Sequence, residues 1–224
     1  MLAYNNHDLT LKNIEHLVSL GYTKNILLFD NGSNPSFEQI SNKLRIRYHQ
    51  EKINIYVNPA WNYIFQNEEC EFLTLLNNDC FLLSSNYFEE ILPHMEKNEI
   101  GISSCKTKNI DKIKNNDLNT SRYFYFYKEA NNLIYNKSAR RQGWLMTLNL
   151  KIYKSLNYQI PNYLKIWYGD DWIWGQFIKN NINTAIYKNR YAVHIKSSSI
   201  SSKLMLEIIK EDNSNLKKYG DWHK

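Results

Sequence analysis

The chain has 224 residues, of which 43% are hydrophobic, and a formal net charge of +6. This length suits a single domain, and so much apolar sequence excludes a largely disordered protein. The positive balance favours an anionic partner such as a nucleotide, a nucleic acid or a membrane surface, but a general richness in lysine and asparagine accounts for it equally well.

The cysteines and the apolar segments bear on where the protein works. The three cysteines show no CxxC spacing, which argues against a zinc site or a disulfide framework and fits a reducing compartment. No apolar run approaches the roughly 18 residues of a membrane span, and the first residues lack the basic and apolar regions of a signal peptide. We therefore expect a cytoplasmic protein, with peripheral membrane contact through its basic faces.

The first half of the chain alternates between strand and helix patterns. Residues 26–29 form a continuous apolar run, as in a strand covered on both faces, and a dense turn signal comes next at 30–35. The expected elements in chain order are a short strand at 2–4, a helix from Asp8 or Thr10 to Gly21, strands at 26–29, 44–48 and 53–57, a helix from Asn58, a strand at 72–76, a helix at 86–97 and a strand at 100–104. Such repeated β-α-β units predict an α/β fold with a mostly parallel central sheet flanked by helices.

The second half of the chain has a weaker order. Residues 106–119 are filled with lysine and asparagine and should form a loop. The aromatic run at 123–127 is typical of a strand, with a sugar- or base-binding surface as the alternative. The remaining expected elements are a strand at 143–146, a helix that opens at Asp170 and Asp171, strands at 184–187 and 191–193, and an amphipathic helix at 201–219.

The strand at 72–76 ends in a group of polar side chains. Its apolar residues stop at Asn77, Asn78 and Asp79, before a second apolar run at 81–83. A carboxylate at the end of a core strand faces a cleft, a cation or a hydrogen-bonding network, because an uncompensated buried charge is costly. Ligands of open α/β sheets bind at the carboxyl ends of the strands, so we predict that Asp79 faces such a site.

Three further polar features fall at strand ends or helix starts. They are Asp30, the pair Asp170 and Asp171, and His194. Each also has an ordinary structural explanation. Asp30 can begin an Asx turn, the acidic pair can cap a helix, and His194 can be a hydrogen-bonded histidine at the end of a strand. Taken one at a time, these residues leave both interpretations open.

The polar segments have an order and spacing that match one known family. Tyr4 and Asn5 precede a helix, residues 26–33 form a strand and turn, and residues 58–62 begin the helix before the strand at 72–79. With the acidic pair and the late histidine, this series resembles the GT-A glycosyltransferases of the family 2 type over nearly the whole chain. The resemblance implies a single GT-A domain and the transfer of a sugar, with inversion, from a nucleotide-sugar donor.

The resemblance assigns a role to each of these segments. The strand at 72–79 is similar to the one that carries the DxD motif, so Asp79 would bind Mn²⁺ or Mg²⁺, with His194 as a second ligand that favours manganese. Asp171 would be the general base, and Asp170 would orient the acceptor or hold the turn. The residues that would bind the nucleotide sugar are Tyr4, Asn5, Asp30, Asn58, Asn77 and Asn78. In relatives the carboxylate that matches Asp30 accepts from a uracil-type N–H, which implies a UDP- or dTDP-sugar.

The same resemblance divides the chain by role. The expected parts are a nucleotide-sugar-binding half at 1–105, a variable loop region at 106–142, an acceptor and catalytic half at 143–200, and a C-terminal helix at 201–224. The acceptor would be a carbohydrate or glycolipid, as in polysaccharide biosynthesis, and no nucleic-acid partner is expected. Trp144, Trp167 and Trp172 offer sugar-stacking faces, with core packing as the alternative for each.

One position departs from the pattern of that family. The first residue of the triplet is Asn77 rather than an aspartate. An amide oxygen adds no negative charge, so weaker metal binding, or an inactive member of the family, remains open. A nucleotide- or nucleic-acid-binding module without catalysis also remains open, because of the positive charge and the aromatic residues. A nucleotidyltransferase finds no support, because no Gly-rich, basic phosphate loop comes after the first strand.

Overall fold

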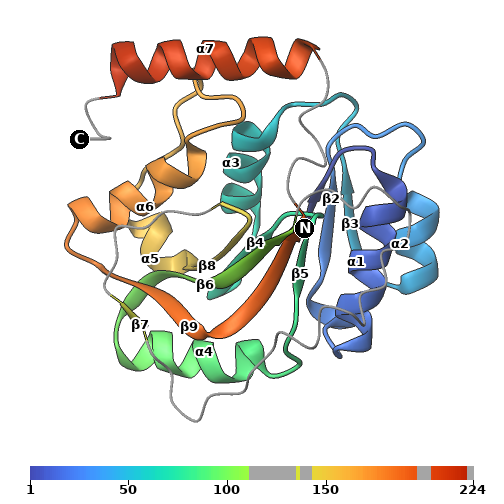
Figure 1. Cartoon of the computed structure of the whole chain (residues 1–224), viewed down its shortest axis with the longest axis horizontal. Helices are drawn as coiled ribbons and strands as arrows, with labels where there is room; N and C mark the ends of the chain where they lie inside the picture. The colour runs from blue at the N-terminus through green and yellow to red at the C-terminus, as the bar shows by residue number, and fades with distance from the viewer. Residues whose placement is uncertain (111–134, 137–142, 196–202, 221–224) are drawn as a thin grey trace.

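The computed structural model describes residues 1–110, 135–136, 143–195 and 203–220 (Figure 1). The helices are α1 (His7–Ser19), α2 (Glu38–Leu44), α3 (Val57–Asn67), α4 (Tyr87–Lys97), α5 (Leu150–Ser155), α6 (Gly169–Lys179) and α7 (Lys203–Tyr219), with one 3-10 turn, η1 (Thr23–Asn25). The strands are β1 (Leu2–Ala3), β2 (Leu27–Asp30), β3 (Arg47–Gln50), β4 (Phe72–Leu76), β5 (Cys80–Leu82), β6 (Ile100–Ile110), β7 (Tyr135–Asn136), β8 (Leu145–Asn149) and β9 (Asn183–Ile195).

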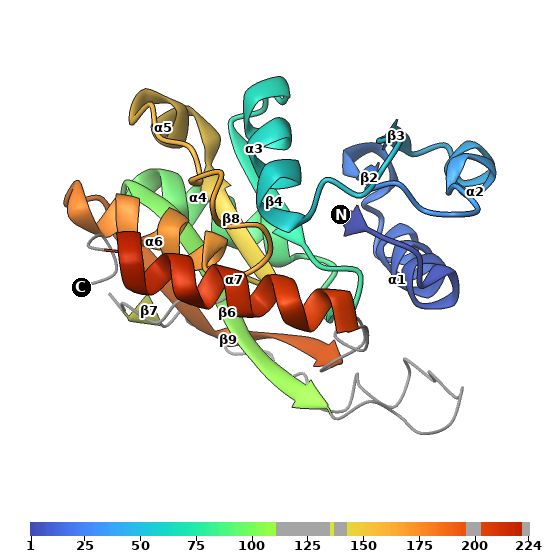
Figure 2. The ribbon, with the colours of Figure 1, turned by 90° about the horizontal axis from the view of Figure 1, so that it is seen from above.

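The strands form two sheets that meet at one point. β1, β2 and β3 make a parallel sheet in that order, and the larger sheet has the order β4-β8-β6-β9-β5, with β7 paired to β9. A parallel bridge between Leu2 and Asn77 joins β1 to the end of β4. Seen from above in Figure 2, β1–β3 with α1 and α2 stand to one side of the larger sheet. The carboxyl ends of β1, β2 and β4 therefore lie along one edge.

The predicted α/β class is confirmed, but only part of the strand system is parallel. β8 runs antiparallel to both β4 and β6, and β5 runs antiparallel to β9, whereas β6 and β9 are parallel. The expectation of a mostly parallel sheet thus holds for β1–β3 and is wrong for the larger sheet. A parallel neighbour needs a crossover connection. β8 instead enters between β4 and β6 from the carboxyl ends of those strands, which reverses its direction.

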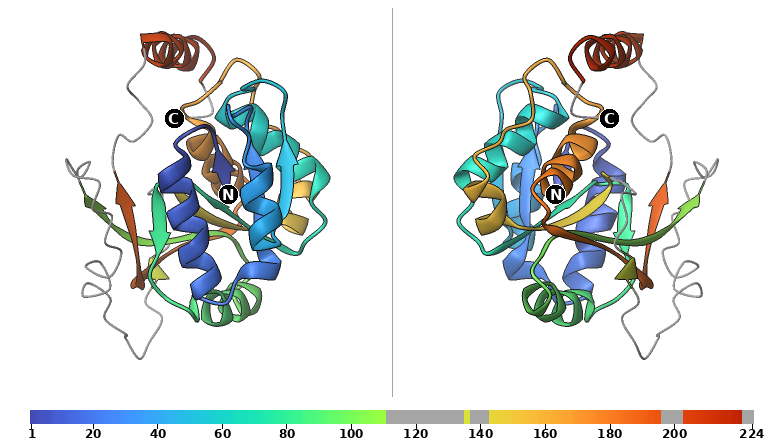
Figure 3. Two further views of the ribbon diagram at one scale, coloured as in Figure 1. Left: turned by 90° about the vertical axis from the view of Figure 1, so that its right-hand side faces the viewer. Right: turned by 90° about the vertical axis from the view of Figure 1, so that its left-hand side faces the viewer.

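Two apolar clusters cover opposite faces of the larger sheet. One packs α1 and α4 against it, and the other packs α3, α5 and α6. Trp61, Ile64 and Phe65 of α3 are buried, as their spacing predicted, and Trp174 of α6 is the largest fully buried side chain. Figure 3 shows α4 and α7 at opposite ends of the molecule, with the sheets between them. In the ranges described, no helix is long and apolar enough to cross a membrane.

Several predicted boundaries need correction. The strand expected at 44–48 begins only at Arg47, because residues up to Leu44 form α2. The loop expected from residue 106 starts later, since β6 continues to Ile110 in parallel register with β9. The two strands expected at 184–187 and 191–193 are one strand, β9. The aromatic run at 123–127 and most of the region 106–142 lie outside the described residues, so those expectations stay untested.

The strand predicted at 53–57 is absent, and the side chain of Asn31 explains why. Its amide nitrogen donates to Oδ1 of Asn54 (3.0 Å) and to the backbone carbonyl of Tyr56 (3.1 Å). Its oxygen accepts from the backbone N–H of Ile55 at 3.0 Å. These bonds take the place of a strand ladder, and Tyr56 adopts a left-handed φ of 70° just before α3. Ile53 and Ile55 therefore belong to a loop that is held by the Asn31 side chain, and Val57 begins α3.

Candidate functional site at the strand ends

Most of the polar residues singled out from the sequence lie at the carboxyl edge of the strands. Tyr4 and Asn5 come directly after β1, Asp30 ends β2, and residues 77–79 come directly after β4. The strands are held in register by the pairing of Ala3 with Asp30 and by the bridge at Asn77. The structure thus brings Tyr4, Asn5, Asp30 and the triplet to one edge, which is where open α/β sheets bind ligands.

Asp30 is fully buried and its carboxylate is engaged within the chain. It accepts from the backbone N–H groups of Ser33 (2.8 Å) and Phe37 (3.0 Å) and from the Tyr48 hydroxyl (2.8 Å). Burial, and then the hydrogen bond to Asp30, raises the pKa of Tyr48 to about 12. Asp30 is therefore the organiser of the 30–37 turn, and its contact with a nucleotide base stays a prediction.

Tyr4 and Asn5 are tied to this turn from the other side. The Asn5 backbone N–H donates to Oγ of Ser33 at 2.8 Å, and Oδ1 of Asn5 accepts from the N–H of Asn34 at 3.0 Å. Asn5 therefore fixes the turn, whereas Tyr4 is 44% exposed at the same edge. An exposed ring on a fixed backbone can stack on a planar ligand.

The triplet turn between β4 and β5 is held by α1. The N–H of Cys80 donates to the carbonyl of Asn77 at 3.0 Å, and the buried Asn13 amide donates to the carbonyls of Asn78 (3.1 Å) and Cys80 (2.8 Å). The Asn78 side chain also points into the protein, where it donates to Oγ1 of Thr10 at 2.9 Å. Sequence reasoning missed Asn13. Its signal is an amide on the apolar face of a helix, a position that needs a buried hydrogen-bond partner.

Asp79 and His194 meet because β5 and β9 pair at the end of the sheet. Cys80 lies opposite His194 in the antiparallel register, and the N–H of Ile195 donates to the Asp79 carbonyl at 2.9 Å. Oδ1 of Asp79 then lies 3.6 Å from Nε2 of His194, with both side chains largely buried. The two metal ligands predicted from the sequence are thus adjacent in space.

The imidazole of His194 is held flat against an aromatic ring. It stacks on Trp144 with the ring centroids 4.8 Å apart and the planes 8° from parallel. The indole N–H of Trp144 donates to Oγ1 of Thr107 at 3.0 Å, which fixes the indole in turn. Trp144 therefore supports the histidine, so the sugar-stacking role is less favoured for it than packing.

The separation of Asp79 and His194 is close to that of two ligands of one divalent cation. Two ligand atoms at about 2.1 Å from one ion lie about 3.0 Å apart at the right angle of octahedral coordination. The observed 3.6 Å is about 0.6 Å wider, so a small movement of the two side chains would bring both atoms within reach of one ion. Among the described residues, no group of three or more His, Cys, Asp or Glu side chains could hold a metal ion. The pair by itself therefore supplies two of the six ligands that an octahedral cation takes.

The acidic pair stands at the start of α6, beside the same edge. Asp170 and Asp171 are half-buried in the first turn, where the free N–H groups of the helix favour a carboxylate. The carboxylate of Asp170 packs against the α-carbon of Gly143, where an added Cβ would lie 2.9 Å from Oδ2. Gly143 directly precedes Trp144, whose carbonyl accepts from the N–H of Asn77 at 3.0 Å. Through Gly143 and Trp144, just before β8, the pair is thus linked to the triplet.

Asn58 lies apart from the other candidates. It is fully buried in the first turn of α3 and donates through Nδ2 to the carbonyl of Trp167 at 3.0 Å. Its Oδ1 lies so close to Gly169 that a Cβ there would be 1.9 Å away. The structure therefore places Asn58 behind the start of α6, where it supports the acidic pair. Trp167, next to it, is 39% exposed, and Trp172 is half-buried edge-on to Tyr158.

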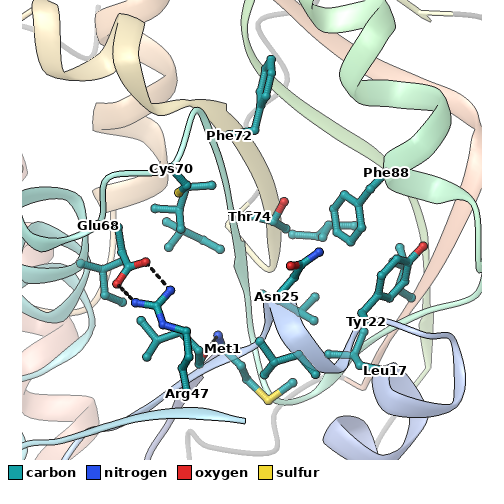
Figure 4. A pocket seen from close by; sticks show the side chains of 18 of the residues that line it. Met1, Leu17, Tyr22, Asn25, Arg47, Glu68, Cys70, Phe72, Thr74 and Phe88 are labelled. Atoms are coloured by element: carbon teal, nitrogen blue, oxygen red, sulfur yellow. Dashed lines mark hydrogen bonds and ion pairs between the residues drawn. The ribbon is translucent and has the colours of Figure 1, made fainter.

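A cavity of about 530 Å³ lies elsewhere, between the two sheets at the amino ends of β1 and β4. Figure 4 shows Phe72, Thr74 and Phe88 around it, with the ion pair of Arg47 and Glu68 (2.7 Å) to one side. The cavity has room because β1 meets β4 only through the bridge of Leu2 with Asn77, just after the carboxyl end of β4. It contains none of the candidate residues, so its size does not identify it as the site.

Comparisons with known proteins give the family of the sequence and the proteins of similar fold. The family model described as "Glycosyl transferase family 2" matches residues 1–156. A search among curated proteins finds no match. Among solved structures, residues 1–349 of S. aureus TarS are similar, with a TM-score of 0.61, 13% identity, and coverage of 97% of this chain and 70% of that chain.

Two further similar structures were solved with ligands. GalNAc-T7 with UDP, GalNAc and Mn²⁺ gives a TM-score of 0.67 at 12% identity, covering 99% of this chain and 49% of that chain. S. aureus TarS in complex with UDP-GlcNAc gives 0.60 at 12% identity, covering 96% of this chain and 64% of that chain. The chain thus spans between half and 70% of the proteins that it resembles. At these identities the likeness shows the fold alone.

Proposed function

This chain belongs to glycosyl transferase family 2, and from that premise we propose that it is an inverting, divalent-metal-assisted transferase of sugars from UDP- or dTDP-linked donors to a carbohydrate or glycolipid acceptor. The observation that carries the proposal is the meeting of Asp79 and His194 at the carboxyl edge of the strands, 3.6 Å apart. The acidic pair of α6 stands beside that edge through the contact of Asp170 with Gly143.

The donor side of the reaction rests on the metal pair and on Tyr4. When bound, a divalent cation would neutralise the charge that develops on the diphosphate leaving group. Asp79 and His194 would hold it, and the stack on Trp144 restricts the rotation of the imidazole. The exposed ring of Tyr4 offers a surface for the base, and the 30–37 turn held by Asp30 lies next to it. UDP is the nucleotide named in two of the similar structures, which supports a uridine donor.

The acceptor side rests on the acidic pair. Asp171 accepts the proton of the acceptor hydroxyl as that oxygen attacks the anomeric carbon from the side opposite the leaving group, which inverts its configuration. The N–H groups at the start of α6 favour a negatively charged side chain at this position. Asp170, pressed against Gly143, holds the first turn of α6 against β8. An imidazole ligand favours Mn²⁺ over Mg²⁺.

The first experiment is a thermal-shift panel of UDP- and dTDP-sugars, including UDP-GlcNAc and UDP-GalNAc, with and without Mn²⁺ or Mg²⁺. A ligand at 100 times its dissociation constant stabilises by about 2.7 kcal/mol. For a domain of this size, that free energy raises the melting temperature by roughly 5–11 °C. No shift with any nucleotide sugar, in the presence of either metal, would contradict the proposal.

Substitutions then separate the two halves of the reaction. Asp79→Asn should abolish the metal-dependent part of the shift and of turnover, because an amide adds no charge to the cation site. Asp171→Asn should keep donor binding and lose turnover. Glu96→Gln, an exposed carboxylate on α4 at the far end of the molecule, is the matched control and should behave as the wild type. Near-normal turnover of Asp171→Asn would show that another group is the base.

A further inference from the structure

Asp212 of α7 is a buried carboxylate that binds three consecutive backbone N–H groups. Its Oδ1 accepts from Lys165 at 2.8 Å, and its Oδ2 accepts from Ile166 at 2.8 Å and from Trp167 at 2.9 Å. The residue is 0% exposed. Hydrogen bonds to an ionised acceptor are about twice as strong as neutral ones. One side chain therefore fixes the backbone of residues 165–167 from the α7 side.

The same three residues are held from the opposite side by Asn58. The backbone N–H of Asn58 donates to the carbonyl of Lys165 at 3.0 Å, and its Nδ2 donates to the carbonyl of Trp167 at 3.0 Å. Residues 165–167 thus give their N–H groups to Asp212 and two of their carbonyls to Asn58. A segment fixed on both edges has little conformational freedom left, although it belongs to no helix or strand.

This segment leads directly into the acidic pair. Tyr168 comes next with a left-handed φ of 65°, and α6 begins at the residue after it, Gly169. The Tyr168 hydroxyl donates to Oδ1 of Asn213, the neighbour of Asp212 on α7. Burial raises the pKa of Tyr168, and the nearby negative charges of Asp171 and Asp212 raise it further. The phenol of Tyr168, which is in the residue directly before α6, is therefore tied to α7 through Asn213.

We propose that α7 is a positioning element for the reaction, in which Asp212, with Asn58 opposite it, sets the place of the acidic pair by fixing residues 165–167. The proposal rests on the role of Asp171 given above. The helix α7 lies outside residues 1–156, the part of the chain that the family model matches. Asp212 is fully buried, so it acts through Asp170 and Asp171 and not by contact with a substrate. Movement of the turn would displace both carboxylates from the strand ends while leaving Asp79 and His194 in place.

The test compares Asp212→Asn with Glu211→Gln on the same helix. The first variant keeps the size of the side chain but replaces one acceptor oxygen by an N–H group that faces a donor. The second removes only the exposed ion pair between Glu211 and Nζ of Lys165 (2.8 Å). Turnover is measured as release of UDP or dTDP from the nucleotide sugar that most stabilises the wild type. It is normalised to the number of donor sites, found by titration with that sugar, so that misfolded protein does not count.

A positioning role predicts a split between binding and turnover. Asp212→Asn should lose at least tenfold in turnover per donor site, with its donor dissociation constant within threefold of the wild-type value. Glu211→Gln should stay within twofold in both quantities. Turnover of Asp212→Asn within twofold of Glu211→Gln would overturn the inference and leave the proposed function standing. If Asp212→Asn does not fold, Asn213→Ala, which removes the partner of the Tyr168 hydroxyl, tests the same split in a milder form.

A second measurement does not depend on activity. Amide hydrogen exchange should become faster in Asp212→Asn at residues 165–167 and onward into the first turn of α6, but not in Glu211→Gln. Exchange that stays slow at Trp172, whose N–H donates to the carbonyl of Tyr168 at 2.9 Å, would overturn the inference even if no nucleotide sugar were turned over. If the wild type releases no nucleotide from any sugar while the exchange changes as expected, the proposed function fails and the positioning of the acidic pair by α7 stands.

Discussion

The contact between Gly169 and Asn58 gives a quantitative test of how α6 is seated. A Cβ on Gly169 would lie 1.9 Å from Oδ1 and 2.6 Å from Cγ of Asn58. The amide cannot swing into solvent, because Asn58 is fully buried and holds the carbonyl of Trp167. Gly169→Ala therefore overpacks the site, at a cost of about 1–3 kcal/mol, and weakens a hydrogen bond worth about 1 kcal/mol. The helix propensity of alanine returns at most about 1 kcal/mol, so a net loss of about 1–3 kcal/mol is expected.

The assay is urea unfolding of four proteins: the wild type, Gly169→Ala, Asn58→Ala and the double variant. Each single substitution should lower the free energy of unfolding. Asn58→Ala removes the atoms that clash, so the double variant should be more stable than the sum of the two losses predicts, by at least about 1 kcal/mol. Losses that add to within about 0.5 kcal/mol, or a Gly169→Ala protein as stable as the wild type, would refute the reasoning.

Three further predictions concern other contacts of the site and its support. Gly143→Ala should displace the carboxylate of Asp170, because its Oδ2 would lie 2.9 Å from the new Cβ. The variant should lose severalfold in turnover, with a nearly unchanged free energy of unfolding. A turnover equal to that of the wild type would contradict this. Trp144→Leu should release the stacked ring of His194 and raise the Mn²⁺ concentration needed for half-maximal turnover, whereas an unchanged metal titration would show that the stack is not needed. Burial lowers the pKa of His16 from 6.5, so the unfolded chain takes up the proton first as the pH falls, and the free energy of unfolding should decrease below about pH 6.5. His16→Gln should flatten that decrease in urea unfolding between pH 7.5 and 5, and an identical slope in both proteins would exclude the histidine as its source.

The polar residues at the strand ends can be found from the sequence, but the contacts that hold them cannot. Asp79 and Asp30 stand out because each polar side chain ends an apolar run, a pattern carried by adjacent residues. The contact of Asp79 with His194 depends on the register of β5 against β9, which brings together residues more than one hundred positions apart. Such pairings are set by tertiary packing, so only the resemblance to a known family suggested this one in advance.

Side chains that bind backbone groups in place of a neighbouring strand or helix turn are harder still to predict. Residues 53–57 alternate as a strand does, yet Asn31 supplies the hydrogen bonds that a neighbouring strand would have supplied. Asp212 lies within a helix whose charged residues fit a solvated face, and its burial could not be read from periodicity. In both cases a polar side chain binds backbone groups from a distant part of the chain, and no local pattern encodes the partner.

These supporting contacts bear on how the proposed cation site at Asp79 and His194 would bind a metal with Asn77 in place of an aspartate. A single carboxylate and a histidine give a cation little charge, so the place of the pair must be well defined for binding to occur. Asn13 holds the triplet turn, and Trp144 holds His194. Because both supports are internal to the protein, they are present before any ligand arrives, and less of the free energy of binding is spent on ordering the site. A site with fewer charges can bind its cation usefully if it is preorganised in this way, and Asn77→Asp should then tighten metal binding without raising turnover in proportion.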